Sequence, residues 1–291
     1  MTQIETLNDA ADLYAALREL AAKTPSLTLA DIYSALATAS PDTSDRLASV
    51  DQGLLRAIMR AGRGQAPVAN EPAVRSFLAK SNPAPLFLPQ ITAGPSIALL
   101  TRGEHPDMPA FSDRAFDAWF AAKGVPYGLG TYGEIRSVYA TDQFADRASP
   151  ERRTRHLGID VFAPAMTPVY APLPGKVAFV TYNADPLDYG NTLILEHDAD
   201  GTPFHTLYGH LAGTLPGLLR VGDTVTPGQL IAHLGDWHEN GGWAAHIHFQ
   251  IMTDMLEQTG GNFYGVGHAS LWDVWQGICI DPNIVLNIPP E

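Results

Sequence analysis

The stretch A-H-I-H-F-Q-I-M, residues 245–252, decides the interpretation of this sequence. It has the length and the apolar content of a β-strand. Residues two apart on a strand project from the same face, so the side chains of His246 and His248 point into one space. Two imidazoles in one space can bind a borderline metal such as zinc. On its own an H-x-H pair is weak evidence, because two half-buried surface histidines give the same pattern.

Two earlier patterns add to this pair. H-L-G-I-D, residues 156–160, places a histidine and a carboxylate four apart, and Y-G-H-L, residues 208–211, supplies another histidine. Two imidazoles and one carboxylate make a three-ligand site with a fourth position open for water, which is typical of catalytic zinc. Two further histidines then remain for proton transfer. Together the three patterns predict a metal-assisted amide hydrolase.

The sequence around these patterns favours an antiparallel β domain. From about residue 155 onward, short runs rich in Val, Ile, Thr, Tyr and Phe are separated by Gly, Pro, Asp and Asn. Runs of this kind are typical of strands, and the lack of long helices between most of them favours antiparallel pairing. The predicted strands are residues 159–162, 167–170, 175–181, 192–196, 204–208, 230–234 and 245–252.

The chain before this domain divides into two regions. Residues 1–64 are predicted to form a small helical region of three helices, because apolar side chains recur at three- and four-residue steps. Such a region could bind a protein partner, associate with a second copy, or pack as a cap on the main domain. Residues 65–110 hold eight of the 23 prolines and predict a linker or an extended wrap. Residues 111–291 are then the catalytic domain with a C-terminal extension, and the expected class is α+β.

Composition excludes several classes of function. The chain has 291 residues and a formal net charge of −13, and beyond Val177 the only basic side chain is Arg220, against thirteen acidic ones. Such a charge repels nucleic acids. The sequence has no run of 18 apolar residues, which excludes a membrane-spanning helix, and its single cysteine, Cys279, excludes a disulfide within the chain. The N-terminus lacks a secretory signal, so we expect a cytoplasmic protein, or an extracytoplasmic one only if a signal has been removed.

The ordered set H-x-x-x-D, Y-G-H-L and H-x-H-F resembles that of the lysostaphin-type, LytM-like zinc endopeptidases. The resemblance covers about residues 155–252 and includes V-G-D-T-V-T-P-G-Q-L-I-A-H-L-G, residues 221–235, which is similar to the family's hairpin before the H-x-H strand. It implies a β-rich antiparallel fold and one zinc ion per chain, bound by His156, Asp160 and His248.

The resemblance also implies roles for other residues. His246 and His210 would be the catalytic histidines, with His246 the preferred general base and His210 sharing that work or stabilising the oxyanion. Tyr208 and Trp243 are expected to contact the substrate. Many members of the family cut glycine-containing peptide bonds in bacterial cell-wall crosslinks.

Two features depart from the family. The segment before the H-x-H pair, residues 236–245, is bulkier than the family's S-T-G-P-like segment and adds two tryptophans, so we expect a reshaped substrate groove. The catalytic region is acidic, whereas many wall-cutting members are basic. Residues 116–136, 185–191 and 281–286 also resemble a LytM-like module found between phosphotransferase-like and aminotransferase-like domains of some large bacterial proteins, which favours an intracellular, non-wall substrate.

The leading hypothesis is therefore a zinc metallopeptidase that hydrolyses a peptide or a small amide. Two alternatives stay open. The first is a non-catalytic LytM-like binding or regulatory module, which the intact set of ligands and catalytic histidines argues against. The second is a metal hydrolase of a non-peptide cytoplasmic amide, which the tryptophan-containing segment permits.

Overall fold

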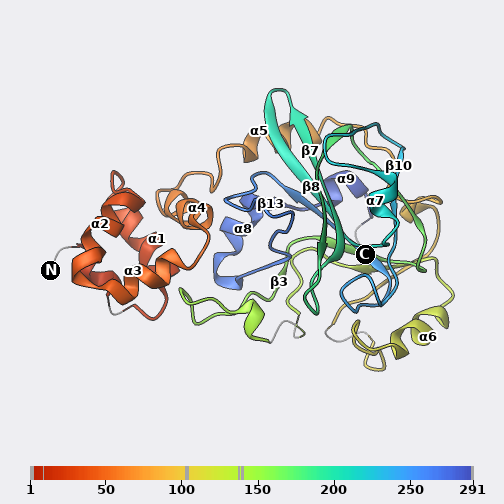
Figure 1. Cartoon of the computed structure of the whole chain (residues 1–291), viewed down its shortest axis with the longest axis horizontal. Coiled ribbons are helices and arrows are strands. Elements are labelled where there is room, and N and C mark those ends of the chain that lie inside the picture. The colour runs from red at the N-terminus through yellow and green to blue at the C-terminus, as the bar shows by residue number, and fades with distance from the viewer. Residues whose placement is uncertain (1–2, 9, 102–104, 137, 139–140, 290–291) are drawn as a thin grey trace.

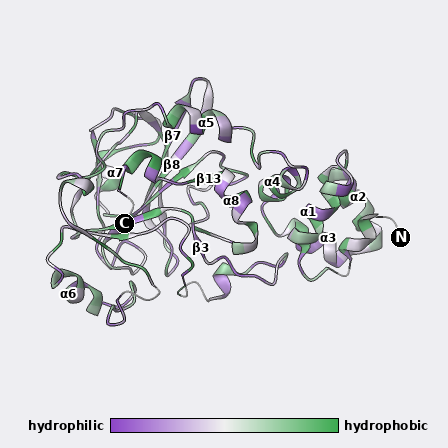
Figure 2. Ribbon diagram, turned by 180° about the vertical axis from the view of Figure 1, so that it is seen from behind, coloured by the Kyte–Doolittle hydropathy of each residue, from purple (hydrophilic) through white to green (hydrophobic). Residues whose placement is uncertain are grey.

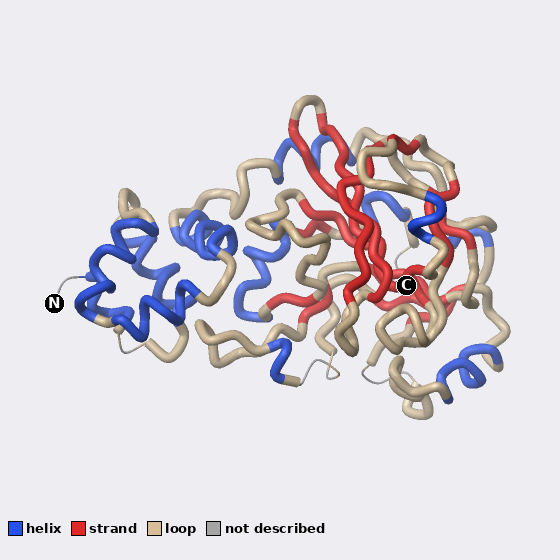
Figure 3. The backbone as a smooth tube through the Cα atoms, in the orientation of Figure 1, coloured by secondary structure: helices blue, strands red, loops and turns tan. Residues whose placement is uncertain are grey.

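The computed structural model describes residues 3–8, 10–101, 105–136, 138 and 141–289. Within them, α-helices gather at the N-terminal end of the molecule and strands dominate the rest (Figure 1, Figure 3). The predicted α+β class is confirmed. Among the described helices, none combines the length and the apolar character that crossing a bilayer requires.

In the described part of residues 1–64, four α-helices follow a 3-10 turn: η1 (Gln3–Leu7), α1 (Leu13–Lys23), α2 (Leu29–Ala39), α3 (Pro41–Ala48) and α4 (Gln52–Gly62). Thr28 and Asp31 form a capping box at the start of α2. The prediction of three helices was wrong by one. Pro41 ends the preceding helix but also occupies the first turn of α3, where a missing N–H is harmless.

The proline-rich stretch 65–110 has more structure than a linker. It contains α5 (Glu71–Leu78), η2 (Ile91–Ala93) and β1 (Ser96–Ala98). A proline lies in the first turn of α5, which helices tolerate, and Val74 of this helix is buried against the sheet. The interpretation of these residues as a plain linker therefore needs correction, because β1 joins the main sheet as a strand, whereas an extended wrap packed along the main domain is compatible with these contacts.

The remaining elements are, in chain order, α6 (Ala115–Ala121), β2 (Tyr127–Gly130), η3 (Asp142–Phe144), β3 (Arg155–His156), β4 (Ile159–Phe162), β5 (Pro168–Tyr170), β6 (Gly175–Asn183), β7 (Gly190–Ala199), β8 (Thr202–Leu211), α7 (Leu215–Leu218), β9 (Thr224–Val225), β10 (Leu230–His233), β11 (His246–Met252), β12 (Val266–Gly267), η4 (Ala269–Leu271), α8 (Trp272–Ile278), β13 (Cys279–Ile280) and α9 (Asn283–Leu286). Each predicted strand is present.

The main sheet has the strand order β1-β2-β4-β11-β8-β7-β6-β9, and β13 pairs with the end of β11. The β1–β2 pair is parallel, and the other pairs are antiparallel. The centre of the sheet is therefore β4, β11 and β8, the strands that carry most of the predicted site residues.

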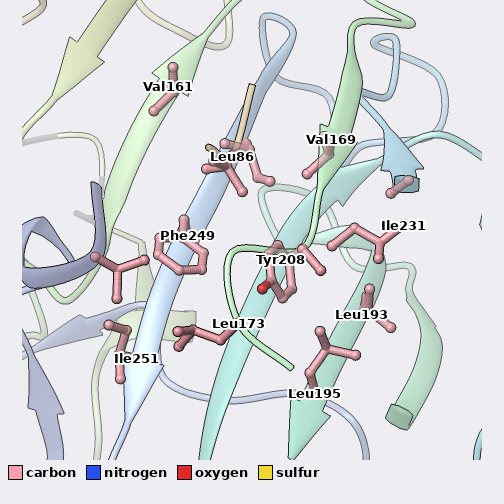
Figure 4. Packing of buried hydrophobic residues seen from close by; sticks show 14 of the residues in the cluster. Leu86, Val161, Val169, Leu173, Leu193, Leu195, Tyr208, Ile231, Phe249 and Ile251 are labelled. Carbon is pink, nitrogen blue, oxygen red and sulfur yellow. The ribbon is translucent and has the colours of Figure 1, made fainter. Parts of the chain in front are cut away.

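One face of this sheet packs against the β5–β10 ribbon. Val161 of β4, Phe249 of β11 and Leu193 of β7 are fully buried there, together with Val169 and Ile231 of the ribbon (Figure 4). Burial of this apolar surface stabilises the fold. Because side chains alternate along a strand, the even-numbered residues of β4 and β11 face the other way.

The opposite face shares its apolar cluster with the N-terminal helices. Leu17 of α1, Ile58 of α4, Trp275 of α8 and Leu207 of β8 belong to one cluster of buried residues. In Figure 2 the helices carry both apolar and polar stretches, as expected for amphipathic helices packed on one side. The helical region therefore packs on the β domain through a shared core.

Candidate metal centre

Strands β4 and β11 pair with His248 directly opposite Asp160. Both side chains, and that of His246, lie on the face away from the β5–β10 ribbon. His156 reaches the same space from β3. Gly158 makes this possible, because a Cβ there would lie 2.6 Å from Cε1 of His248.

Three donor atoms from these residues form a small triangle. The distance from His156 Nε2 to His248 Nδ1 is 3.1 Å, from His156 Nε2 to Asp160 Oδ1 3.2 Å, and from His248 Nδ1 to Asp160 Oδ1 3.1 Å. Two ligands of a tetrahedral zinc ion, each about 2.0–2.1 Å from the metal, lie about 3.3 Å apart. The triangle therefore has the chemistry and nearly the dimensions of a three-ligand zinc site, and this group is a candidate metal site.

The outer nitrogens of both histidines have hydrogen-bond acceptors. His156 Nδ1 lies 2.9 Å from the carbonyl oxygen of Thr131, so this nitrogen carries the proton and donates it. His248 Nε2 lies 2.7 Å from Gln250 Oε1 and donates to it. Gln250 is oriented in turn, because its Nε2 donates to the carbonyl oxygen of Tyr264 at 3.0 Å. The inner nitrogens then present lone pairs to one another, an arrangement that a cation between them would stabilise.

Asp160 is held by a buried arginine. Its Oδ2 accepts a hydrogen bond from Arg136 Nη1 at 2.6 Å, and Arg136 Nε donates to Glu134 Oε2 at 2.9 Å. Burial by itself would raise the pKa of Asp160, but His156 and Arg136 outweigh it and hold that pKa well below its usual range. The carboxylate is therefore charged, and Oδ1 is left to face the two histidines.

His246 and His210 lie beside this triangle. Their rings are 4.2 Å apart between centroids. Each Nδ1 faces a backbone carbonyl oxygen, that of Ala244 at 2.7 Å and that of Asn240 at 2.8 Å. Each Nδ1 therefore carries a proton, and each Nε2 keeps a lone pair. His246 Nε2 is 4.0 Å from Asp160 Oδ2.

Burial keeps these two imidazoles neutral. Burial lowers the pKa of His246 to about 4, against a smaller opposing effect of Asp160. Burial, together with the neighbouring His246, lowers the pKa of His210 well below its usual range. A neutral imidazole with a free Nε2 can accept a proton at neutral pH.

His210 reaches this site through an irregularity in β8. Regular alternation would put its side chain on the same face as Tyr208. His210 instead has a φ of 61°, and the pairing of β7 with β8 shifts register between Asn191 and Leu193. Such a bulge turns the side chain to the other face of the sheet.

The same irregularity overturns the prediction that Tyr208 contacts substrate. Tyr208 is fully buried in the core on the ribbon side, against Phe249 (Figure 4). Trp243 does line the site, since its ring lies 6.1 Å from that of His210. Three further residues at the site were not predicted from the sequence: Tyr189, whose OH lies 3.5 Å from His248 Nε2, Arg136 and Gln250. For Gln250 a signal existed, because it continues the alternation of His246 and His248 on one strand face.

A cavity of about 340 Å³ opens over the four residues Asp160, His210, His246 and His248. Its walls come from three loops, residues 142–153, 185–189 and 258–266, and Phe111, Arg136 and Trp243 complete the lining. The five candidate site residues are at most 6% exposed. Only a slender group could therefore reach them through the cavity.

Residues 154–259 match the model of peptidase family M23. Over these residues the chain is similar to peptidase family M23. The match supports a metallopeptidase domain, and the His156, Asp160 and His248 group is compatible with its metal site.

One curated relative, the uncharacterized lipoprotein YgeR of Escherichia coli (strain K12), is 36% identical over 94 residues, which cover 32% of this chain and 33% of the relative. The chain thus spans about a third of the length of that relative. A zinc-containing peptidase from Vibrio cholerae is 33% identical over 34% of this chain and 28% of that one, with a TM-score of 0.29. The catalytic domain of lysostaphin from Staphylococcus simulans is 24% identical over 59% of this chain and 97% of that one, with a TM-score of 0.35. At these TM-scores the structural likenesses carry no further argument.

Proposed function

We propose that this M23 domain is a zinc-dependent hydrolase of peptide bonds, with zinc bound by His156, Asp160 and His248. The observation that carries the proposal is the donor triangle, with sides of 3.1 and 3.2 Å and with both outer imidazole nitrogens bonded to acceptors. When bound, zinc supplies a water of lowered pKa and a Lewis acid for a substrate carbonyl.

The chain's own residues supply the proton transfers. His246 presents a free Nε2 and is the proposed general base, which accepts a proton from the attacking water and later donates it to the leaving amine. His210 presents a second Nε2 lone pair beside it and is proposed to share the base role; when His210 instead of His246 accepts the water proton, its Nε2–H can donate a hydrogen bond to the developing oxyanion. Both are neutral at neutral pH because they are buried.

The cavity indicates the size of the substrate. A volume of about 340 Å³ accommodates a short peptide segment, and the nearly complete burial of the donor atoms favours small side chains beside the bond that is cut. Trp243 and Tyr189 are proposed to contact that segment. The same enclosure favours a small non-peptide amide as the second candidate.

The test is metal analysis joined to a substrate screen. The full chain is loaded with zinc and incubated with glycine-rich peptides, with cell-wall fragments and with small amides. We expect about one zinc per chain and hydrolysis of at least one class. His156→Ala should lose both, whereas the matched control His238→Ala, which changes an exposed histidine of the segment 236–245, should keep both.

Two results would argue against the proposal. A chain that takes up no zinc would favour the binding-module alternative. A folded His156→Ala variant that keeps its zinc and its activity would mean that the ligands are assigned wrongly.

A further inference from the structure

Two walls of the cavity contact the N-terminal helices. The wall 142–153 contributes Gln143, Phe144 and Arg153 to the lining, and the wall 258–266 contributes residues from Gln258 to Val266. Figure 1 shows the helical region beside α8 and beside the segment that leads into β3.

The wall 142–153 turns at Asp146. Oδ1 of this residue accepts hydrogen bonds from the backbone N–H groups of Ala148 and Ser149, at 3.0 and 3.1 Å, which forms the turn. Oδ2 accepts a hydrogen bond from the Tyr14 hydroxyl of α1 at 2.8 Å. The backbone N–H of Leu13 donates to the carbonyl oxygen of Ala148 at 2.8 Å. The start of α1 therefore holds the tip of this wall.

Beyond that turn the wall reaches the cavity. The backbone N–H of Arg153 donates to the carbonyl oxygen of Phe144 at 2.9 Å, and its Nη2 donates to that of Gln143 at 2.9 Å. The two sides of the loop are thus tied together, so a displacement of the turn at Asp146 would move the residues that line the cavity.

The wall 258–266 is held by the start of α4. Asp51 caps this helix, since its Oδ1 accepts from the N–H of Leu54 at 3.0 Å. Its Oδ2 accepts from Gln258 Nε2 at 2.7 Å and from the N–H of Glu257 at 3.3 Å. Gly53 packs so closely that a Cβ there would lie 2.8 Å from Cα of Leu256. One carboxylate therefore connects the helix with a residue of the cavity lining.

The two walls also meet each other. The Arg153 guanidinium lies 5.3 Å from the ring centroid of Tyr264, which belongs to the second wall. Both walls therefore contact the helical region, in which α1 packs against α4, and the two walls contact one another.

From these contacts we infer that residues 1–64 set the spacing of the two walls and so determine which substrates fit, with Tyr14 and Asp51 as positioning residues. The inference rests on the proposed function for its catalytic readout. It assigns to the helical region a task in substrate binding that does not involve the metal.

Two single variants of the full chain test the contacts of the two walls one at a time. Tyr14→Phe removes only the hydroxyl that bonds to Asp146. Asp51→Asn keeps an oxygen for the helix cap but replaces the acceptor of Gln258 with a donor. The matched control is Arg18→Gln, which breaks the pair between α1 and Asp273 of α8 without contacting either wall.

Hydrogen–deuterium exchange by mass spectrometry is measured first. We expect severalfold faster amide exchange in residues 142–153 for Tyr14→Phe and in residues 256–266 for Asp51→Asn, with β4 and β11 unchanged and zinc content unaltered. With the peptide identified by the screen, KM should rise about fivefold in each variant while kcat changes less than twofold. Arg18→Gln should match the parent chain in every readout.

Equal exchange in all three variants and the parent would overturn the inference, as would a fall in kcat with unchanged KM. If the parent chain hydrolyses nothing, the proposed function fails, yet the exchange pattern still decides whether the helices brace the walls.

Discussion

The floor of the cavity, formed by Asp160, His210, His246 and His248, and its walls, the loops 142–153, 185–189 and 258–266, are positioned by different kinds of contact. The floor consists of residues on neighbouring strands, where the pairing of His248 with Asp160 follows from the register of β11 and β4. The walls are loops whose restraining contacts come from distant helices, such as the bond between Asp51 and Gln258, which are 207 residues apart. A strand fixes where its side chains point through backbone geometry, whereas a loop depends on its packing partners. We therefore expect chemistry to depend on the floor and substrate choice on the walls.

Replacement of a floor ligand should have the largest effect. His248→Ala removes one donor of the triangle and leaves two, so zinc content should fall from about one per chain to near zero and hydrolysis should fall to background. Elemental analysis after dialysis, together with the peptide assay, measures both. If the folded variant keeps its zinc, the floor does not bind metal through His248.

Replacement of the histidines beside the triangle should affect turnover alone. His246→Gln and His210→Gln each remove a proton-transfer group, so kcat should fall by about 10²–10⁴-fold while zinc content stays near that of the parent. Steady-state kinetics with parallel metal analysis tests this. A loss of zinc in His246→Gln would show that a ligand has been mistaken for a base.

A smaller effect is expected at Gln250, which links the floor with a wall. Gln250→Leu removes the acceptor of His248 Nε2–H and the donor to Tyr264, so zinc affinity should weaken by about 10–100-fold. Gln250→Glu keeps the acceptor and should retain most of that affinity. Competition with a chelator gives the affinities, and equal weakening in both variants would contradict the role of the acceptor.

The smallest effect concerns a buried histidine outside the floor. Burial lowers the pKa of His197 to about 4, so the native state binds its proton less readily than the unfolded state does. The contribution of neutral His197 to the free energy of unfolding is complete above about pH 6.5 and is lost as pH falls toward 4. By pH 5 the loss is about 2 kcal/mol.

His197→Gln should therefore lose less stability than the parent chain between pH 7 and pH 5. Urea unfolding at the two pH values measures the difference, and zinc content at pH 7 should not change. Equal losses of unfolding free energy in the parent chain and in the variant would mean that His197 does not contribute to acid sensitivity.

The sequence predicted the floor better than the walls. Alternation along β11 is a local property, so the common direction of His246 and His248 could be inferred from their spacing alone. The expectation that Tyr208 contacts the substrate was wrong, because Tyr208 is buried on the ribbon side of β8, whereas the left-handed backbone at His210 turns that histidine to the other face. Arg136 was missed, since nothing in its local sequence shows that it bonds to Asp160.

By itself, the sequence determined the class of fold, the predicted strands, the helical character of the N-terminal region and the residue types that could bind a metal. These follow from periodicity and side-chain chemistry, which act over a few residues. Only the tertiary structure decided the donor triangle, the burial that lowers the pKa of His246, and the contact of α1 and α4 with the cavity walls. Distances between segments far apart in the chain, and the exclusion of water around them, arise only when the whole chain packs.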